Sequence, residues 1–222
     1  TIQTVFKISS GDNTFFPLID AIAGFGKPTI ISTGLVDLSY LDFLHRRWAE
    51  RKSGQAELAF LHCVSGYPVP DDQANLRAIS ALKGRFPETT IGYSDHTIGI
   101  EAALSSVALG AQIVEKHFTI DHNYSDFRDH KRSADPREMK TLVDRIRDTE
   151  LLLGSGRKES QPLENATRMV VRRSICAARS LKRGTVLSLD DLTWLRPGEG
   201  IPAGNEFEVV GRVLKHPLQK GE

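Results

Sequence analysis

The sequence has few of the features that mark several common functional classes. Its 222 residues include two cysteines, Cys63 and Cys176, which are too few for a disulfide framework. We therefore expect reduced thiols and a cytoplasmic protein. No apolar run approaches the roughly 20 residues of a membrane-spanning helix. The 29 basic residues balance 28 acidic ones, so neither a membrane nor a nucleic-acid partner is expected.

The chain does contain a regular alternation of short apolar runs and amphipathic segments. The apolar runs, which are typical of buried strands, cover residues 4–8, 28–32, 58–63, 89–93 and 112–117. The segments with helical character cover residues 16–23, 38–51, 73–84, 100–109 and 136–153. Asp135 and Pro136 suit the N-cap and the first turn of the last helix. Five strands that alternate with helices predict an α/β fold with a parallel sheet.

Such a sheet can be an open doubly wound sheet or part of an eight-stranded barrel. No glycine-rich dinucleotide fingerprint follows any of the strands, which weakens the first alternative. Every strand ends in small polar or ionisable residues, and a (β/α)8 TIM barrel draws its site from several strand ends. We therefore expect the C-terminal five β/α units of a TIM barrel. The other three units, on the order of 90 residues, would have to precede Thr1, so we expect the chain to be a fragment.

The composition changes after residue 153. Residues 154–170 are polar and contain glycine and proline, as in a linker. Residues 171–222 contain short β-like runs separated by turns, which is typical of a small β-rich domain. We therefore predict a barrel segment at residues 1–153, a linker at 154–170 and a second domain at 171–222.

Two histidines follow the fourth and fifth predicted strands. His96 lies in the block Gly92–Thr97, and His117 lies in the block Val114–Thr119. If both close adjacent parallel strands, their imidazoles project from the same edge of the sheet. Neutral imidazoles there could bind a divalent metal, although two hydrogen-bonded histidines at a sheet rim would show the same pattern.

Lys7, Ser10, Ser32 and Ser94 lie at the ends of separate predicted strands, where they could converge on a phosphate group. The lysine would supply positive charge and the hydroxyls would supply hydrogen-bond donors. Serine is also common after strands because it caps the helix that follows. Both interpretations stay open at this point.

Three further stretches carry candidate binding residues. The charged loop at residues 126–133 follows the last strand, so that Asp129 or His130 could contact a substrate, although a solvated loop is the default. Tyr67 belongs either to a rigid turn or to a pocket wall. Arginines of the second domain could bind an anion or simply solvate that domain; they are Arg172, Arg173 and Arg196.

Several of these blocks occur together, in order, along nearly the whole chain. They are residues 6–12 (Phe-Lys-Ile-Ser-Ser-Gly-Asp), 26–34, 61–68 (Leu-His-Cys-Val-Ser-Gly-Tyr-Pro), 92–97 (Gly-Tyr-Ser-Asp-His-Thr), 115–119 (Glu-Lys-His-Phe-Thr), 172–175 and 196–200. Each block is short, but the combination resembles the sialic acid synthase family, which joins phosphoenolpyruvate to an N-acylated hexosamine.

The resemblance implies a TIM barrel followed by a SAF, or antifreeze-like, β-clip domain. It implies a transferase that makes a nine-carbon sialic acid-type sugar and phosphate from phosphoenolpyruvate and N-acetylmannosamine or a diacetamido relative. It also implies a divalent metal, usually Mn²⁺ with Mg²⁺ or Co²⁺ as alternatives. The implied assembly is a homodimer with swapped SAF domains, in which Arg196 reaches the sugar site of the other subunit.

The resemblance also assigns roles to individual residues. The metal ligands would be His96 and His117, and Tyr67 would lie beside them in the catalytic group. The residues that would grip phosphoenolpyruvate are Lys7, Ser10, Ser32, Ser65 and Ser94. The residues that would contact the sugar are Tyr67, Asp129 and Arg196.

Departures from the family pattern bear on these expectations. The first barrel strands normally bring an acidic residue and a Lys/Gln pair, so without them the chain by itself can be inactive. Ser9 replaces a usual glycine and Ser65 a frequent asparagine, which changes the phosphate site in detail. The loop at 125–136 lacks the Pro-Asp-His form of the N-acetylneuraminate enzymes, so the acceptor sugar stays open.

Two other functions stay open. One is a different phosphoenolpyruvate-dependent synthase of 2-keto-3-deoxy sugar acids, although the second domain argues against it. The other is a non-catalytic sugar- or anion-binding protein built on the same scaffold.

Overall fold

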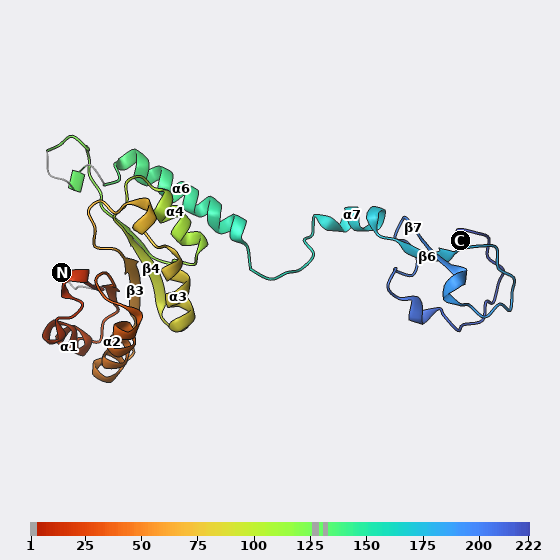
Figure 1. The fold of residues 1–222 in the computed structure, drawn as a ribbon, viewed down its shortest axis with the longest axis horizontal. Helices are drawn as coiled ribbons and strands as arrows, with labels where there is room; N and C mark the ends of the chain where they lie inside the picture. Colours follow the sequence, from red (N-terminus) through yellow and green to blue (C-terminus); the bar gives the residue numbers. More distant parts are fainter. Residues whose placement is uncertain (1–3, 126–128, 131–132) are drawn as a thin grey trace. The chain divides into compact units, whose positions relative to one another are not determined.

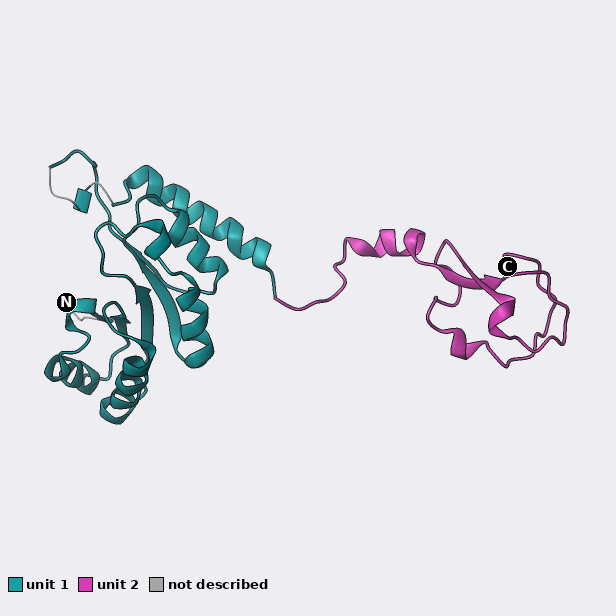
Figure 2. Cartoon of the chain, viewed as in Figure 1, with its two compact units in different colours: residues 1–155 teal, residues 156–222 magenta. Residues whose placement is uncertain are grey.

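The computed structural model describes residues 4–125, 129–130 and 133–222. The chain divides into two compact units, residues 1–155 and 156–222, which are teal and magenta in Figure 2. Residues 126–128 and 131–132 of the charged loop lie outside the described residues.

The first unit contains a sheet of five parallel strands whose spatial order follows the sequence. They are β1 (Phe6–Ile8), β2 (Thr29–Ser32), β3 (Leu58–Cys63), β4 (Thr90–Asp95) and β5 (Val114–Lys116). Each strand pairs with the next one, without the reversal of order that defines a doubly wound sheet. The sheet curls into part of a barrel (Figure 1), so the predicted five units of a TIM barrel are confirmed.

A helix follows each strand of this sheet. These helices are α1 (Phe16–Gly24), α2 (Leu38–Arg51), α3 (Arg77–Arg85), α4 (Glu101–Ala108) and α6 (Pro136–Leu153). The Asp37 side chain caps α2 by accepting a hydrogen bond from the backbone N–H of Tyr40. Asp135 and Glu138 form a reciprocal capping box at the start of α6, where the sequence predicts the N-cap. The short 3-10 turn η1 (Ser10–Asp12) precedes α1. A second turn, η2 (Asp71–Gln73), precedes α3, which therefore begins at Arg77 rather than at the expected residue 73.

Helices and strands share one apolar core on the outer face of the sheet. Ile31 on β2, Phe60 on β3 and Ile91 on β4 pack in the same core as residues of α1, α2 and α3. A separate cluster of Ile100, Ala103 and Leu142 joins α4 to α6. Successive side chains of a strand point to opposite faces, so the neighbours of the core residues point to the inner face. These inner-face residues are Lys7, Ser32, Cys63, Ser94 and Glu115.

The second unit is built mainly from turns around one small antiparallel sheet. Its sheet pairs β6 (Ser174–Ala177) with β7 (Leu192–Leu195), and its short helical turns are η3 (Leu189–Asp191) and η4 (Glu206–Glu208). Helix α7 (Glu164–Val171) falls largely within the segment that the sequence predicts as a linker. Glu164 in its first turn and Arg168 in its last turn complement the helix dipole.

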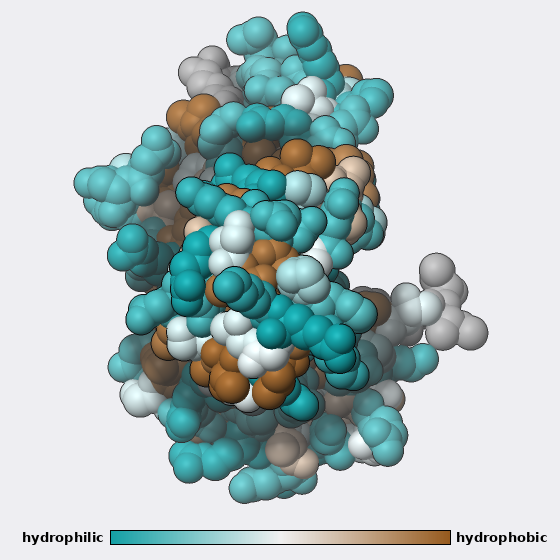
Figure 3. Space-filling view, turned by 90° about the vertical axis from the view of Figure 1, so that its right-hand side faces the viewer, coloured by the Kyte–Doolittle hydropathy of each residue, from teal (hydrophilic) through white to brown (hydrophobic). Residues whose placement is uncertain are grey.

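The second unit has a small core. Among the described residues, its buried apolar side chains are Ala177, Leu181 and Leu192. Figure 3 shows one face of the chain, on which small groups of apolar residues lie between hydrophilic ones. Backbone hydrogen bonds such as the reciprocal pair between Leu181 and Leu218 supplement this core. In the described part of the chain, no helix has the length and apolar character needed to cross a membrane.

Candidate active site

The two candidate metal ligands lie side by side at the carboxyl ends of adjacent strands. His96 directly follows β4 and His117 directly follows β5, and these strands are paired in parallel. The centroids of their imidazole rings are 5.3 Å apart. The ring of Tyr67, from the loop after β3, lies 4.4 Å from that of His96 and 6.2 Å from that of His117. The structure therefore brings all three predicted catalytic residues together.

The hydrogen bonding of His96 determines which nitrogen could bind a metal. Its Nδ1 lies 2.9 Å from the carbonyl oxygen of Val64. Because a carbonyl oxygen can only accept, Nδ1 carries the proton and Nε2 has the lone pair. Such second-sphere hydrogen bonds commonly orient a metal-binding imidazole.

A pocket of about 240 Å³ lies at these two strand ends. Its lining combines two imidazoles, two carboxylates, an ammonium group and a hydroxyl, from Ser94, Asp95, His96, Glu115, Lys116 and His117. The side chains of Asp95 and Lys116 are buried and paired with each other, so a ligand in this pocket could meet the imidazoles of His96 and His117 and the side chains of Ser94 and Glu115.

Candidate phosphate-binding residues meet on the inner face of the sheet. Lys7 Nζ donates a hydrogen bond to Ser32 Oγ at 2.9 Å and lies 3.2 Å from a carboxylate oxygen of Glu115. The other carboxylate oxygen of Glu115 accepts a hydrogen bond from Ser94 at 2.7 Å. Glu115 therefore occupies the position between a cation and a hydroxyl that an anionic ligand would take.

Glu115 is a site residue that the sequence reasoning missed, although it lies in the block Glu115–Thr119. Two features could have identified it: side chains alternate between the two faces of a strand, and the pairing register of β4 and β5 sets which residues are neighbours. Ser94 and Glu115 are direct neighbours across β4 and β5, so their side chains share a face.

Ser10 and Ser65 form a second part of this region, around Gly34. The backbone N–H of Gly34 donates to Ser10 Oγ at 3.0 Å. A Cβ atom at position 34 would collide with the hydroxyls of both serines, so glycine leaves this space open. Ser65 Oγ is buried and, among the described residues, has no hydrogen-bond partner. Because buried hydroxyls are normally satisfied, this one suits an oxygen of a ligand or of water.

Cys63 lies between the candidate metal ligand His96 and the candidate phosphate-binding residues Ser10 and Ser94. Burial would raise the pKa of its thiol, but hydrogen bonds with His96, Ser10 and Ser94 outweigh burial and lower that pKa. The sulfur lies 3.8 Å from Nδ1 of His96. The predicted metal-binding and phosphate-binding residues therefore lie around one thiol.

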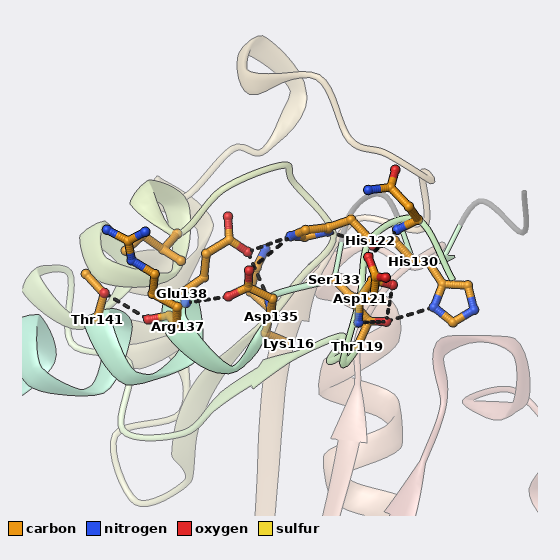
Figure 4. A network of polar contacts seen from close by, with 12 residues as sticks. Lys116, Thr119, Asp121, His122, His130, Ser133, Asp135, Arg137, Glu138 and Thr141 are labelled. Carbon is orange, nitrogen blue, oxygen red and sulfur yellow. Dashed lines mark hydrogen bonds and ion pairs between the residues drawn. The ribbon is translucent and has the colours of Figure 1, made fainter. Parts of the chain in front are cut away.

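His122 fastens the loop after β5 to the start of α6 (Figure 4). His122 Nδ1 lies 3.0 Å from the carbonyl oxygen of His130, and its Nε2 lies 3.2 Å from Glu138 and 3.7 Å from Asp135. The ring of His130 lies 2.8 Å from the hydroxyl of Thr119. The bond to the His130 carbonyl and the two carboxylates raise the pKa of His122.

The side chains of His122, Asp135 and Glu138 offer ligand atoms within 4.8 Å of one another, as a metal site would. The two carboxylates, however, also cap the N-terminus of α6, whose dipole disfavours a cation. We therefore interpret the group as a loop anchor. This anchor holds His130, the residue after Asp129, through its carbonyl oxygen. The predicted contact of Asp129 with the sugar stays a prediction.

Arg196, the third candidate for the sugar, lies in the second unit. Its Nε donates a hydrogen bond to the carbonyl oxygen of Val171 at 2.8 Å. Its predicted contact with a sugar of the other subunit stays a prediction.

Comparison with known proteins gives the same picture for both parts of the chain. A sequence profile of the NeuB family matches residues 2–158, and one of the SAF domain matches residues 172–222. The chain is 38% identical to N,N'-diacetyllegionaminic acid synthase of Campylobacter jejuni, over 98% of the chain and 65% of that protein. It is 36% identical to human N-acetylneuraminate-9-phosphate synthase, over 94% of the chain and 57% of that protein.

A solved structure agrees. The crystal structure of N-acetylneuraminic acid (sialic acid) synthetase from Leptospira borgpetersenii, in complex with citrate, superposes with a TM-score of 0.69 at 36% identity. The match covers 74% of this chain and 56% of that one. The chain thus spans less than two thirds of the length of the relatives it matches. Because the family profile covers residues 2–158 and the relatives align over nearly the whole chain, this protein belongs to the NeuB family.

Proposed function

We propose that this protein is a sialic acid-type synthase, which condenses phosphoenolpyruvate with an N-acylated hexosamine. The relatives named above are synthases of legionaminic acid and of N-acetylneuraminate 9-phosphate, and a further relative is a pseudaminic acid synthase. The observation that carries the proposal is that His96 and His117 share one pocket with Ser94 and Glu115. Glu115 in turn contacts Lys7 and Ser94, which are candidate phosphate-binding residues.

In the proposed reaction, the enol carbon of phosphoenolpyruvate attacks the aldehyde carbon of the open-chain sugar. Water then adds to the carbon that carries the phosphate, and inorganic phosphate leaves. The products are a nine-carbon 2-keto-3-deoxy sugar acid and phosphate. The acceptor would be N-acetylmannosamine or a diacetamido relative.

His96 and His117 would hold the divalent cation, which we propose to be Mn²⁺, with Mg²⁺ or Co²⁺ as alternatives. The residues fit such an ion because the two rings are adjacent and Val64 leaves the lone pair of His96 on Nε2. When bound, the ion would act as a Lewis acid on the aldehyde oxygen. The ring of Tyr67 packs beside both histidines and would limit the access of water.

The phosphate group would be held by Lys7, Ser10, Ser32, Ser65 and Ser94. Lys7 supplies charge, and the buried hydroxyl of Ser65 would gain the hydrogen bond that no described residue gives it. Fixed donors of this kind position the enol against the aldehyde without reorganisation during the reaction. Glu115 would have to turn away when phosphate enters, since it lies between Lys7 and Ser94.

Recognition of the sugar is proposed to involve Tyr67, Asp129 and Arg196, the last from a swapped SAF domain in a homodimer. Relatives are longer than this chain, so full activity is proposed for a protein that includes the remaining barrel strands.

Phosphate release from phosphoenolpyruvate tests the proposal. The complete protein is incubated with Mn²⁺ and unacylated aldoses and, in parallel, with Mn²⁺ and a panel of N-acylated hexosamines. We expect release that requires one of these sugars and stops when a chelator is added. Release with an unacylated aldose alone would indicate another 2-keto-3-deoxy sugar acid synthase. No release with any sugar, from folded and metal-loaded protein, would indicate a non-catalytic sugar- or anion-binding protein.

A further inference from the structure

Two consecutive cross-strand pairs join β4 to β5 directly before the candidate metal ligands. Ser94 faces Glu115 in the ladder, and Asp95 faces Lys116. Since side chains alternate, the first pair lies on the inner face of the sheet and the second lies on the outer face. The residues that follow these pairs are His96 and His117.

The outer pair is fully buried. Lys116 Nζ lies 2.8 Å from Asp95 Oδ2, and the two side chains are 2% and 0% exposed. The other carboxylate oxygen of Asp95 accepts hydrogen bonds from the backbone N–H of Thr97 at 2.9 Å and from the Thr97 hydroxyl at 2.8 Å. Tyr93 also donates to this oxygen at 3.3 Å, and burial together with Asp95 raises the pKa of its phenol.

The same pair fixes the residues that flank His96 in the chain, Asp95 itself and Thr97. Asp95 precedes His96 and binds the N–H of Thr97, and Lys116 donates to the carbonyl oxygen of Thr97 at 2.9 Å. The turn that carries His96 is therefore tied to the strand that carries His117. A shift of one residue in the pairing of β4 and β5 would break these bonds and separate the histidines.

Stability does not by itself account for this pair. Removing two charges from water is costly, and well-packed neutral replacements of buried ion pairs are often neutral or stabilising. Burial of Asp95 and Lys116 next to two candidate metal ligands is better explained by a requirement for geometry.

We propose that Asp95 and Lys116 are positioning residues, which hold the imidazoles of His96 and His117 at the separation and orientation that a divalent cation requires. The inference rests on the proposed function, in which those histidines bind the metal. The two charged groups act through the histidines and contact neither substrate.

Mn²⁺ binding, followed by electron paramagnetic resonance on the full chain, tests this role without a measurement of turnover. The double variant D95N/K116M removes both charges and leaves no unpaired ion. We expect it to fold, by circular dichroism, and to bind Mn²⁺ about 10- to 100-fold more weakly, as for other changes behind metal ligands. The control is D20N/R47M, which removes the partly buried pair between α1 and α2. It should bind Mn²⁺ like the wild type.

A second variant covers the case in which the double variant does not fold. Thr97→Val is nearly isosteric and removes only the hydroxyl that donates to Asp95. We expect a several-fold loss of Mn²⁺ affinity in a folded protein. Wild-type affinity in Thr97→Val and in any folded double variant would overturn the positioning role alone. A wild-type protein that binds no Mn²⁺ would overturn the proposed metal site and this inference with it.

Discussion

Lys7 and Glu115 lie on the first and last strands of the five-stranded sheet, yet Lys7 Nζ is 3.2 Å from a carboxylate oxygen of Glu115. Neighbouring strands are about 4.8 Å apart, so in a flat sheet β1 and β5 would be separated by roughly 19 Å. The side chains can meet only because the sheet curls. This curvature assembles the candidate phosphate site from strands that are distant in the sheet order.

Glu115→Gln tests the role of this contact. The change removes a negative charge beside the candidate phosphate site, so we expect tighter binding of phosphoenolpyruvate. Both groups are partly exposed, and such screened pairs contribute up to about 1 kcal/mol, which corresponds to a roughly five-fold lower Kd. Isothermal titration calorimetry measures the Kd of phosphoenolpyruvate. The control is Glu150→Gln, which changes an exposed residue of helix α6. Unchanged affinity in Glu115→Gln would show that the carboxylate does not face the phosphate.

Gly34→Ala tests the space between Ser10 and Ser65. The added methyl group would collide with both hydroxyls, so we expect phosphoenolpyruvate to bind at least about ten-fold more weakly. Overpacking of this kind destabilises a protein by about 1–3 kcal/mol, which urea denaturation would measure. Gly84→Ala is the matched control because nothing lies within 4 Å of its Cβ. Because Gly84 lies in helix α3, Gly84→Ala should raise the free energy of unfolding by roughly 0.5–1 kcal/mol and leave the affinity for phosphoenolpyruvate unchanged.

His96→Ala and His117→Ala should each abolish metal-dependent phosphate release while the fold survives. Each change removes one of two adjacent imidazoles that would bind the cation. The exposed His216→Ala is the control. Circular dichroism checks the fold, and undiminished turnover in either variant would contradict the metal assignment.

Arg196→Ala should raise the KM of the sugar more than the KM of phosphoenolpyruvate, because the proposed contact of its guanidinium is with the acceptor. Steady-state kinetics with each substrate varied in turn measures the two effects. An equal rise in both constants would argue against a direct sugar contact.

His122→Gln tests the loop anchor through its pH dependence. The folded protein raises the pKa of His122 above its usual value of 6.5. A raised pKa means that protonated His122 stabilises the fold fully below about pH 6.5, and that this contribution disappears as pH rises through the folded pKa. The melting temperature of the wild type should therefore exceed that of His122→Gln at about pH 5.5 and approach it at about pH 8.5. A difference that does not vary with pH would contradict the ion pairs with Asp135 and Glu138.

Much of the fold follows from local patterns. Apolar runs and helical periodicity place the five strand–helix units of the first unit, and Asp135 and Pro136 mark the start of α6 correctly. Helix α7 was missed because its neighbouring residues are polar and contain glycine and proline, whereas the helix itself is short.

The sequence by itself determined that His96 and His117 end consecutive strands, and consecutive parallel strands of a barrel are neighbours. The partners of the charged groups depended on the tertiary structure. Register decided that Glu115 faces Ser94 and that Lys116 faces Asp95, and curvature decided that Glu115 reaches Lys7. A pattern along the chain specifies which residues form strands and which faces are apolar. Contacts between charged side chains also require the distances and angles between strands, which only the folded sheet sets.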